Sequence, residues 1–411
     1  MSSDVVVTGL GAITPSGGDA AATWEGLTAG RSAIGPITRF DTSGLDARIA
    51  AEVRDFDPVA VMGAKRARRS VRFSQYAVAA AREAVTDAGI VVDDTNAGRV
   101  AVIINTAVSG IAPTEVAVHT MDAEGPLAVS PFFVPQMIPS VPACEVAIDL
   151  GVHGPVTAAA LACASGTAAL LDARRLLLSG EADVVIAGGT DAPLVPSMLG
   201  GLGAMGALSA RNDDPTAASR PFDADRDGFV PGEGSVVAVL ERAEDAAARG
   251  ARAYGRMAGG AMTADAYHLS APDRQGRFAT EAIRLALERA DVAPEDVDYV
   301  CAHGTSTPAN DKTESLALRT AFGGAIDGVA VSSPKSMLGH LMGGAGTLSA
   351  LVCLLAIRDG IIPPTINLDT VDPECDLDHV ANVARQTPVR AAVANAFGFG
   401  GQNCVVVLTA A

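Results

Sequence analysis

Short apolar runs alternate with longer amphipathic stretches along the whole chain, a pattern typical of βα units around a buried sheet. In the first part, strands are predicted over Asp4–Gly9, Val100–Asn105, Val156–Leu161, Asp183–Gly188 and Val236–Glu241. In the second part, they are predicted over Ala253–Gly260, Tyr299–His303, Val329–Ser332, Val393–Phe397 and Cys404–Leu408. Helices are predicted over Ser70–Ala88, Ser165–Ser179, Ala243–Arg249, Thr280–Ala290, Lys312–Phe322 and Gly346–Asp359. The repeated pattern predicts an α/β fold of two similar halves, residues 1–250 and 251–411, packed as one body.

Three long connections rich in glycine and proline interrupt this pattern: Ala107–Pro139, Ser197–Glu233 and Ala261–Arg277. Connections of this length in a compact enzyme usually form lids, pocket walls or interfaces. The first contains the apolar cluster Pro131–Pro135, in a chain with only 4% aromatic residues. We interpret the cluster as a candidate subunit interface or pocket wall, with ordinary core packing as the alternative.

The composition is typical of a large, compact α/β enzyme: 49% of the 411 residues are hydrophobic, 19% are charged, and 43 are glycine. The six cysteines form no Cys-x-x-Cys pair and no cluster with histidine at metal spacing, so we expect neither a disulfide framework nor a metal site. We expect no cofactor, since no Gly-x-Gly-x-x-Gly turn opens a helix after a strand. No basic segment precedes the N-terminal apolar run and no apolar segment of about 20 residues is evident, so we expect a cytoplasmic protein without a membrane span.

The net charge of −17 argues against general nucleic-acid binding. One segment differs, because residues 65–72 contain five cations, among them Lys65, Arg68 and Arg69. The ordinary interpretation of such a run is a solvated helix face. The functional interpretation is a docking site for an acidic macromolecule, made selective by the acidic surface around it.

Cys163 is the strongest candidate nucleophile, in the tetrapeptide Cys-Ala-Ser-Gly of the segment Gly154–Gly180. It lies where an extended segment turns into a helix. Free backbone N–H groups and the positive end of the helix dipole at that point favour a thiolate. The alternative is a small core residue, because free cysteine is often buried. This segment alone does not decide between the two.

Two histidines follow strand patterns in glycine-rich segments: His303 opens His-Gly-Thr-Ser-Thr-Pro, and His340 closes Lys335–His340. Open α/β sheets gather reactive groups at strand C-termini. A single histidine is more often structural than catalytic, but a thiol with two such histidines indicates a nucleophile and its electrophilic partners. The segment Asn395–Asn403 alternates glycine with phenylalanine, and its backbone N–H groups can form an oxyanion hole.

Together these motifs resemble the elongating β-ketoacyl-acyl carrier protein synthases of the thiolase superfamily, over Val5–Leu408. The matching motifs come in the family's order: Gly154-Pro155 and Cys163-x-Ser-Gly, His303-Gly-Thr-Ser-Thr-Pro with Asp311 and Glu314, Lys335-Ser-x-x-Gly-His340, and Gly398-Phe-Gly-Gly401. The resemblance implies a thiolase-like five-layer αβαβα fold made from two duplicated halves. It also implies an acyltransferase that condenses malonyl carrier protein with an acyl chain, releasing carbon dioxide.

The resemblance implies a role for each site residue. Cys163 takes the acyl group, His303 and His340 stabilise the malonyl enolate, and Glu314 holds Lys335, which tunes the histidines. The N–H groups of Cys163 and Phe399 are expected to form the oxyanion hole, with Gly400 in the same gate.

The resemblance also implies partners. Acyl- and malonyl-loaded acyl carrier proteins are expected to dock at Lys65, Arg68 and Arg69. The chain most resembles the ketosynthase subunit of type II polyketide synthases, in Gly154–Thr157, Gly189–Pro193 and Asp372–Asp378. A heterodimer with a chain-length factor is therefore expected. The alternative is a fatty-acid elongating synthase, which His303–Pro308 resembles more closely, as a homodimer.

The chain departs from the family pattern at two positions. The common glutamate nine residues after the second histidine is Ser349, and the basic residue before Ala207 is Gly206.

Two competing protein classes share the fold. A non-condensing chain-length factor lacks the nucleophile, which is intact here, and a thiolase has a second glycine-flanked cysteine, a setting that Cys404 lacks.

Overall fold

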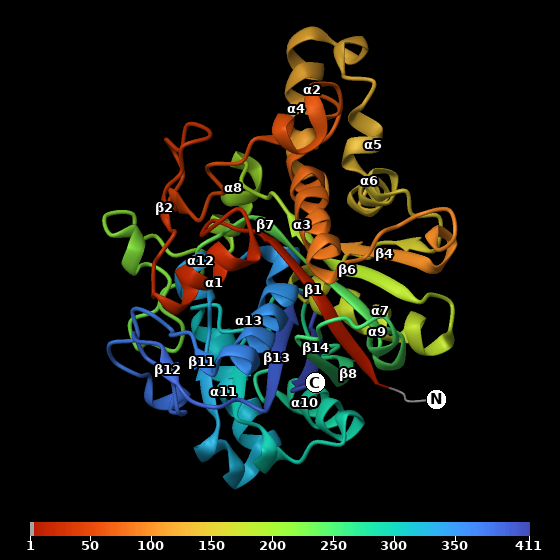
Figure 1. Cartoon of the computed structure of the whole chain (residues 1–411). Helices are drawn as coiled ribbons and strands as arrows, with labels where there is room; N and C mark the ends of the chain where they lie inside the picture. The colour runs from red at the N-terminus through yellow and green to blue at the C-terminus, as the bar shows by residue number, and fades with distance from the viewer. Residues whose placement is uncertain (1–3) are drawn as a thin grey trace.

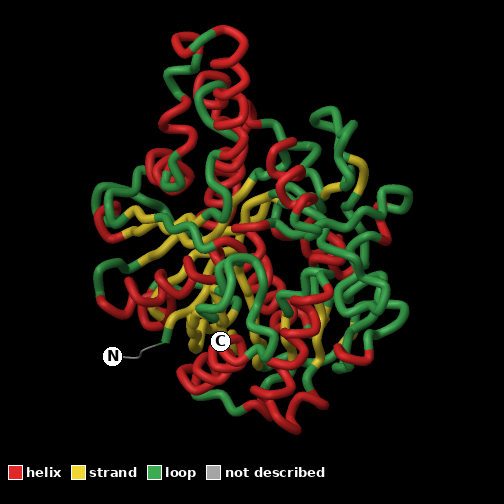
Figure 2. Tube along the Cα trace, turned by 180° about the vertical axis from the view of Figure 1, so that it is seen from behind, coloured by secondary structure: helices red, strands yellow, loops and turns green. Residues whose placement is uncertain are grey.

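The computed structural model describes residues 4–411, and its ten-stranded sheet runs through the middle of the molecule (Figure 2). The strands follow the order β10-β9-β13-β14-β8-β1-β7-β6-β4-β5. Their bounds are β1 Val5–Ile13, β4 Val100–Asn105, β5 Val156–Thr157, β6 Val184–Asp191, β7 Gly234–Arg242, β8 Gly255–Ala264, β9 Tyr299–Cys301, β10 Ala330–Ser332, β13 Ala391–Gly398 and β14 Gln402–Thr409. Two small ladders, β2–β3 (Gly35–Pro36, Ile49–Ala50) and β11–β12 (Ile361–Ile362, Arg385–Gln386), lie outside it.

The sheet consists of two sets of five strands with the same topology. Outward from the centre, the first set reads β1-β7-β6-β4-β5 and the second reads β8-β14-β13-β9-β10. In each set the first two pairings are antiparallel and the last two are parallel. The expected α/β fold of two duplicated halves is therefore confirmed, while the boundary at residue 250 stays a prediction.

The two sets of strands form two layers and the helices form three more, which gives the expected five. The central layer holds α7 (Ser165–Ser179) and α13 (Ala345–Asp359), which contact each other and strands of both halves. Helices α3 (Arg72–Ala88) and α6 (Val141–Leu150) cover the first set of strands. Helices α10 (Arg277–Ala290) and α11 (Pro308–Phe322) cover the second, as Figure 1 shows at the lower edge. The remaining helices include α1 Ala20–Thr28, α2 Pro58–Ala67, α9 Ala243–Ala248 and α12 Lys335–Leu338.

The two central helices pack through a matched pair of glycine–threonine contacts. A Cβ on Gly166 of α7 would lie 2.6 Å from Thr347 Oγ1, and a Cβ on Gly346 of α13 would lie 2.3 Å from Thr167 Oγ1. Only glycine permits this approach of the two backbones. The crossing brings the N-termini of both helices together, and these ends carry the site.

Helix α13 corrects one expectation. The stretch Met342–Asp359 is long and apolar enough to cross a membrane, contrary to the expectation that no such segment exists. It is 83% buried inside the protein, and this burial in the central layer accounts for its composition.

The long connections contain more helix than the sequence predicts. Helices α4 (Ile111–Glu124), α5 (Phe133–Met137) and α8 (Pro196–Ala204) lie within or at the start of them. In Figure 1, α4 and α5 stand with α2 at the top of the molecule, away from the sheet. Only Ala117 of α4 is buried, so the apolar periodicity that would reveal this helix is absent.

Two further expectations change in detail. The strand predicted over Val156–Leu161 ends at Thr157, because the backbone N–H of Ala159 binds the side chain of Asn105 instead of a strand. The cluster Pro131–Pro135 is not core, since Val134 is 61% exposed.

Candidate active site

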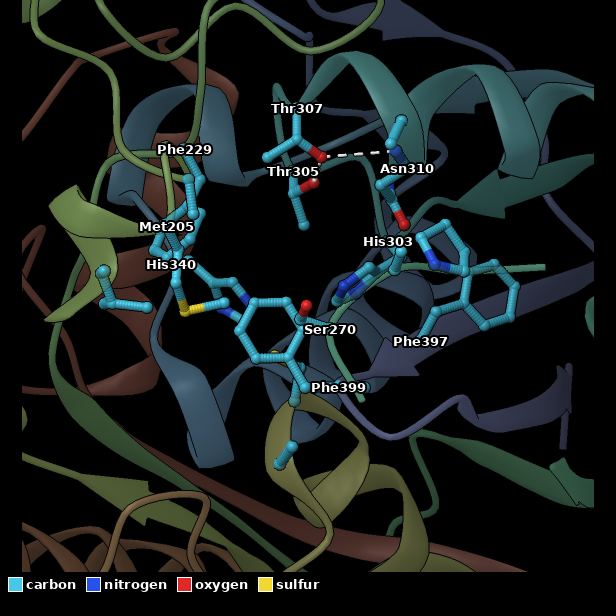
Figure 3. A pocket seen from close by; sticks show the side chains of 18 of the residues that line it. Met205, Phe229, Ser270, His303, Thr305, Thr307, Asn310, His340, Phe397 and Phe399 are labelled. Atoms are coloured by element: carbon cyan, nitrogen blue, oxygen red, sulfur yellow. Dashed lines mark hydrogen bonds between the residues drawn. The ribbon is translucent and has the colours of Figure 1, made fainter. Parts of the chain in front are cut away.

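A cavity of about 510 Å³ opens where the two halves meet, and it is mostly apolar (Figure 3). Residues from both halves line it, including Cys163, His303, His340 and Phe399. In Figure 3, the side chains of His303, His340 and Phe399 come together in the cavity, and the two imidazole rings are in edge contact with centroids 5.5 Å apart. The sequence-predicted nucleophile and both histidines are thus brought to one place, although they come from different elements.

Cys163 lies in a 3₁₀ turn, Ala162–Ala164, directly before α7. Ala162 has a left-handed φ of +46°, which bends the chain sharply at the nucleophile. The turn is packed against β13, because a Cβ on Gly398 would lie 2.9 Å from the carbonyl oxygen of Leu161. This close approach explains the glycine at the start of the Gly398–Gly401 segment.

Burial raises the pKa of the Cys163 thiol to about 11, and the charge of Lys335 and the N–H of Phe399 offset this only in part. The resting side chain is therefore a thiol at neutral pH. The expected thiolate is not favoured in this state, because burial of the sulfur outweighs the Lys335 charge and the N–H groups of Phe399 and Cys163.

His340 has one ring nitrogen occupied and one free. Its Nδ1 accepts the backbone N–H of Met342 at 3.1 Å, which places the ring proton on Nε2. The Nε2 atom is buried and has no hydrogen-bond partner. Burial and then the charge of Lys335 hold the pKa of His340 well below its usual range, so the ring is neutral. The cavity therefore contains one unused N–H donor.

Lys335 supports His303 in a way the sequence did not predict. Its Nζ donates to the carbonyl oxygen of His303 at 2.6 Å. Glu314 accepts the backbone N–H groups of His303 and Gly304, each at 2.8 Å, and the side-chain N–H of Asn395 at 3.0 Å. In residues 4–411 the expected ion pair between Lys335 and Glu314 is absent, and the two are linked through the His303 backbone. Burial, followed by the Lys335 charge, holds the pKa of His303 well below its usual range.

The glycine segment supplies one of the two expected donors. The backbone N–H groups of Phe399 and of Cys163 itself are within hydrogen-bonding reach of the sulfur. The N–H of Gly400 donates to the carbonyl oxygen of Leu269 at 2.7 Å. The N–H of Gly400 is therefore not available to an oxyanion in this conformation, and the place of Gly400 in the gate stays a prediction.

The sulfur of Cys163 and a ring nitrogen from each of His303 and His340 lie within 4.8 Å of one another. By distance alone such a group can hold a metal ion. A metal needs a lone pair on His340 Nε2, however, and the Met342 N–H places a proton there. The arrangement instead presents a thiol beside two neutral imidazoles, which suits attack on a thioester and stabilisation of a developing oxyanion.

Sequence models of two known domains match the chain. The beta-ketoacyl synthase N-terminal domain matches residues 2–246, and the beta-ketoacyl synthase C-terminal domain matches residues 254–369. The chain belongs to the beta-ketoacyl synthase family.

Curated relatives of this ketosynthase include the "3-oxoacyl-[acyl-carrier-protein] synthase 2" of Synechocystis sp., 49% identical over 97% of this chain and 96% of the relative. The protein of the same name from Staphylococcus aureus strain N315 is 44% identical over 98% and 97%. The chain is accordingly an acyltransferase, a β-ketoacyl-acyl carrier protein synthase with condensing activity.

Solved ketosynthases share the whole fold. "The ishigamide ketosynthase/chain length factor" aligns with a TM-score of 0.93 at 38% identity, covering 99% of each chain. A type II polyketide ketosynthase, AntDE, in complex with its acyl carrier protein aligns with a TM-score of 0.92 at 32% identity, again over 99% of each. These similarities cover both halves and the whole site.

Some cations of the basic segment 65–72 bind other side chains of the protein, and others are exposed to solvent. Arg66 forms an ion pair with Asp149, and Arg72 donates to the hydroxyl of Tyr76 at 2.5 Å. The side chains of Lys65, Arg68 and Arg69 are exposed. Of the three residues singled out for docking, Arg69 also stacks over the ring of Phe132, at 5.1 Å from its centroid.

The structure shows the surroundings of Ser349 and Gly206, the two residues that depart from the family pattern. Ser349 is buried in α13 and donates its hydroxyl to the carbonyl of Ala345 at 3.2 Å, so the helix itself satisfies it. Gly206 follows α8 with a φ of +65° and lines the cavity. A Cβ there would meet nothing within 4 Å, so the glycine leaves the cavity wall open.

Sequence reasoning missed the role of Asp191. The sequence marks this residue only as part of Gly189–Pro193, but it is fully buried at the end of β6 and contacts the turn after His340. An acidic residue directly after an apolar strand was the available signal, since buried carboxylates are rare unless paired.

Proposed function

We propose that Cys163 receives an acyl group from an acyl carrier protein and that His303 and His340 then stabilise the enolate of the malonyl donor. The observation that carries this proposal is the cluster of Cys163 Sγ and the two imidazole nitrogens within 4.8 Å, with His340 Nε2–H unpartnered. A buried donor without an acceptor costs stability unless a ligand supplies the acceptor. A thioester oxygen supplies it.

In the loading step, the Cys163 sulfur attacks the acyl thioester carbonyl. The S–C bond to the carrier arm breaks, and the thiol proton leaves with the carrier thiol. The N–H groups of Cys163 and Phe399 lie close to the sulfur and stabilise the oxyanion formed there. The neutral resting thiol is consistent with this loading step, because the buried sulfur carries no charge before the acyl group arrives.

In the condensing step, the malonyl donor loses carbon dioxide, and the electron pair of the broken C–C bond forms an enolate. His303 and His340 hold the thioester oxygen that becomes negative. Both rings are neutral and 2–3% exposed, so their donors act without competing water. The enolate carbon then attacks the acyl-Cys163 carbonyl, and the thiolate leaves and is protonated again.

The carrier protein docks at Lys65, Arg68 and Arg69 in this proposal. The AntDE structure includes its acyl carrier protein, which supports such a partner for a ketosynthase of this fold. Three exposed cations on a chain of net charge −17 offer an acidic partner one preferred approach.

Fatty-acid elongation is the pathway that the comparisons support better. The relatives named 3-oxoacyl-acyl carrier protein synthase 2 are 44–49% identical, whereas the AntDE and ishigamide ketosynthases are 32% and 38% identical. The polyketide pathway expected from sequence becomes the second candidate. It keeps one favourable observation, the match to the ishigamide ketosynthase at a TM-score of 0.93.

The ketosynthase works as a dimer in this proposal, in the cytoplasm. The helices that stand away from the sheet expose large apolar side chains, including Val116 at 65%, Leu127 at 100% and Val134 at 61%. Exposed apolar groups gathered on one projecting region are typical of an interface. A second copy of the chain fits the fatty-acid pathway, and a chain-length factor fits the polyketide one.

Reconstitution tests the function. Purified enzyme with acyl- and malonyl-carrier protein is expected to form the β-ketoacyl product, measured by mass spectrometry of the carrier arm. Replacement of His303 or His340 by alanine should slow malonyl decarboxylation more than loading of Cys163. Equal slowing of both steps would contradict the assigned roles. The partner that co-purifies, a second copy or a homologue without the nucleophile, decides the pathway.

Docking has its own test. Reversal of Lys65, Arg68 and Arg69 to glutamate is expected to weaken carrier binding about tenfold or more at low salt, with the difference shrinking as salt rises. Reversal of three other exposed arginines, Arg175, Arg284 and Arg289, changes the net charge equally and serves as the control. Equal effects of the two triple variants would assign the result to net charge alone.

A further inference from the structure

We propose that Asp191 is a positioning residue that fixes the turn after His340 and thereby keeps the ring proton of His340 on Nε2. The inference rests on the proposed function, in which that Nε2–H binds the malonyl oxygen. Asp191 does not line the cavity, and it acts on His340 through the backbone.

The contacts of Asp191 join the two halves. Its Oδ2 accepts the N–H of Gly343 at 2.6 Å and that of Ala107 at 2.7 Å. Its Oδ1 accepts the hydroxyl of Thr106 and, at 3.3 Å, the N–H of Val108. One buried carboxylate thus ties the loop after β4 in the first half to the residues after His340 in the second.

The turn that Asp191 binds has a strained backbone. Met342 has a left-handed φ of +49°, a strained conformation for a residue other than glycine. The consecutive N–H groups of Met342 and Gly343 point to His340 Nδ1 and to Asp191 Oδ2. The two peptide planes meet at the Cα of Met342, so a change in its φ and ψ after loss of the Gly343 contact turns the Met342 N–H as well.

Loss of the Gly343 contact has a chemical consequence. Without it, Met342 relaxes towards an unstrained conformation, and its N–H leaves His340 Nδ1. The imidazole can then carry its proton on Nδ1 and present a lone pair to the cavity. A lone pair at Nε2 repels the enolate oxygen that an N–H would stabilise, so decarboxylation slows.

Asp191 also acts on Cys163 through its charge. The negative charge of Asp191 helps to raise the pKa of Cys163, while Lys335 lowers it and the neutral His303 and His340 carry no charge. The two effects of Asp191 are separable, because one depends on an acceptor atom and the other on a charge.

Two substitutions separate them. Asp191→Asn retains a carbonyl oxygen for the Gly343 N–H but loses the charge, whereas Asp191→Ala loses both. The tautomer of His340 is read from ¹⁵N spectra of histidine-labelled enzyme without substrate, with the His340 signals assigned from His340→Asn. Glu241→Gln is the control, because Glu241 is a buried acid on β7, opposite the far end of β6 from Asp191, where it binds Thr8 and Arg249.

We expect Nε2–H alone in the wild type and in Asp191→Asn, and a mixture of tautomers in Asp191→Ala. Malonyl decarboxylation should fall about tenfold or more in Asp191→Ala, with acyl loading of Cys163 within about threefold of wild type. The pH profile of Cys163 alkylation should move to lower pH in Asp191→Asn and stay in place in Glu241→Gln. Asp191→Ser, too short to reach Gly343, replaces the alanine variant if that variant does not fold.

A folded Asp191→Ala or Asp191→Ser enzyme with His340 wholly in the Nε2–H form would overturn the proposal. Equal slowing of loading and decarboxylation would also overturn it, because a general structural defect slows both. If the wild type makes no β-ketoacyl product, the proposed function fails. The tautomer, read without substrate, still decides the role of Asp191.

Discussion

The two halves of the enzyme place the same turn at the same point and use it differently. In the first half, Leu161, left-handed Ala162 and Cys163 lead into α7; in the second, Leu341, left-handed Met342 and Gly343 lead into α13. Both helices are 15 residues long and end at a left-handed glycine, Gly180 or Gly360. Where the first turn has the nucleophilic Cys163, the second has Gly343, which has no side chain.

The difference shows how the two copies of a duplicated turn can take different roles in one active site. The first turn presents a side chain, so its reactivity depends on what surrounds the sulfur. The second turn presents backbone N–H groups, which orient His340 on one side and bind Asp191 on the other. The missing side chain is what allows Asp191 to approach, because a Cβ on Gly343 would lie 2.5 Å from Asp191 Oδ2.

The largest expected effect comes from making the first turn like the second. Cys163→Gly removes the nucleophile, and product formation should fall at least about 1,000-fold, because no other group on this turn can hold the acyl chain. Malonyl decarboxylation should persist, since both histidines remain. β-Ketoacyl product and released carbon dioxide are measured together. Retained condensation would end the assignment of Cys163.

Filling the second turn gives the next effect. Gly343→Ala places a methyl group against Asp191 and the Ala107 N–H, so decarboxylation should fall about 10- to 100-fold through displacement of the turn. Gly201→Ala in α8 is the control, since its Cβ would meet nothing within 4 Å. If the two variants behave alike, the second turn needs no glycine and the comparison fails.

The neutral histidines predict a pH dependence of stability. Their folded pKa values lie well below the unfolded value of about 6.5, chiefly through burial. Below pH 6.5 the unfolded chain binds protons that the native histidines do not, so stability falls as pH falls, by up to about 1.4 kcal/mol per pH unit for each histidine.

The double variant His303→Asn/His340→Asn should therefore show a shallower loss of stability between pH 6.5 and 5, measured by denaturant titration at about five pH values. His119→Asn on α4, whose side chain is 77% exposed, is measured alongside as the control variant. An unchanged slope in the double variant would show that the native rings take up protons.

The smallest effect concerns the strained residue of the first turn. Ala162→Gly should raise the free energy of unfolding by less than about 1 kcal/mol, because relief of the left-handed strain is partly offset by the greater freedom of glycine in the unfolded chain. Thermal and denaturant unfolding measure it. A clear destabilisation would mean that the methyl group of Ala162 contributes to the packing of this turn.

Much of this arrangement was predictable. The strands follow apolar runs, and α7 matches its predicted bounds because Gly180 ends it and the leucines mark its buried face. Cys163, His303 and His340 were found because glycine-rich segments follow strands at those points. Helix α4 was not predicted, since it lies on the outside of the molecule and lacks a buried face.

The features of the site that the sequence did not predict share one physical cause. The protonated thiol of Cys163, the Lys335 contact with the His303 carbonyl and the engaged Gly400 N–H all depend on residues distant in sequence. Residue types and spacing indicate which groups can react. They do not indicate how deeply a sulfur is buried or which carbonyl reaches an N–H first.

The crossing of α7 with α13 has a consequence for how the chain is made. Helix α7 leaves the ribosome long before α13 is translated, by roughly 10–30 s at bacterial rates of synthesis. Until then its Gly166–Thr167 surface has no partner, and neither set of strands has its shared inner layer. A chain that stops before α13 therefore exposes the apolar interior of the first half, which makes truncated products targets for chaperones and proteases.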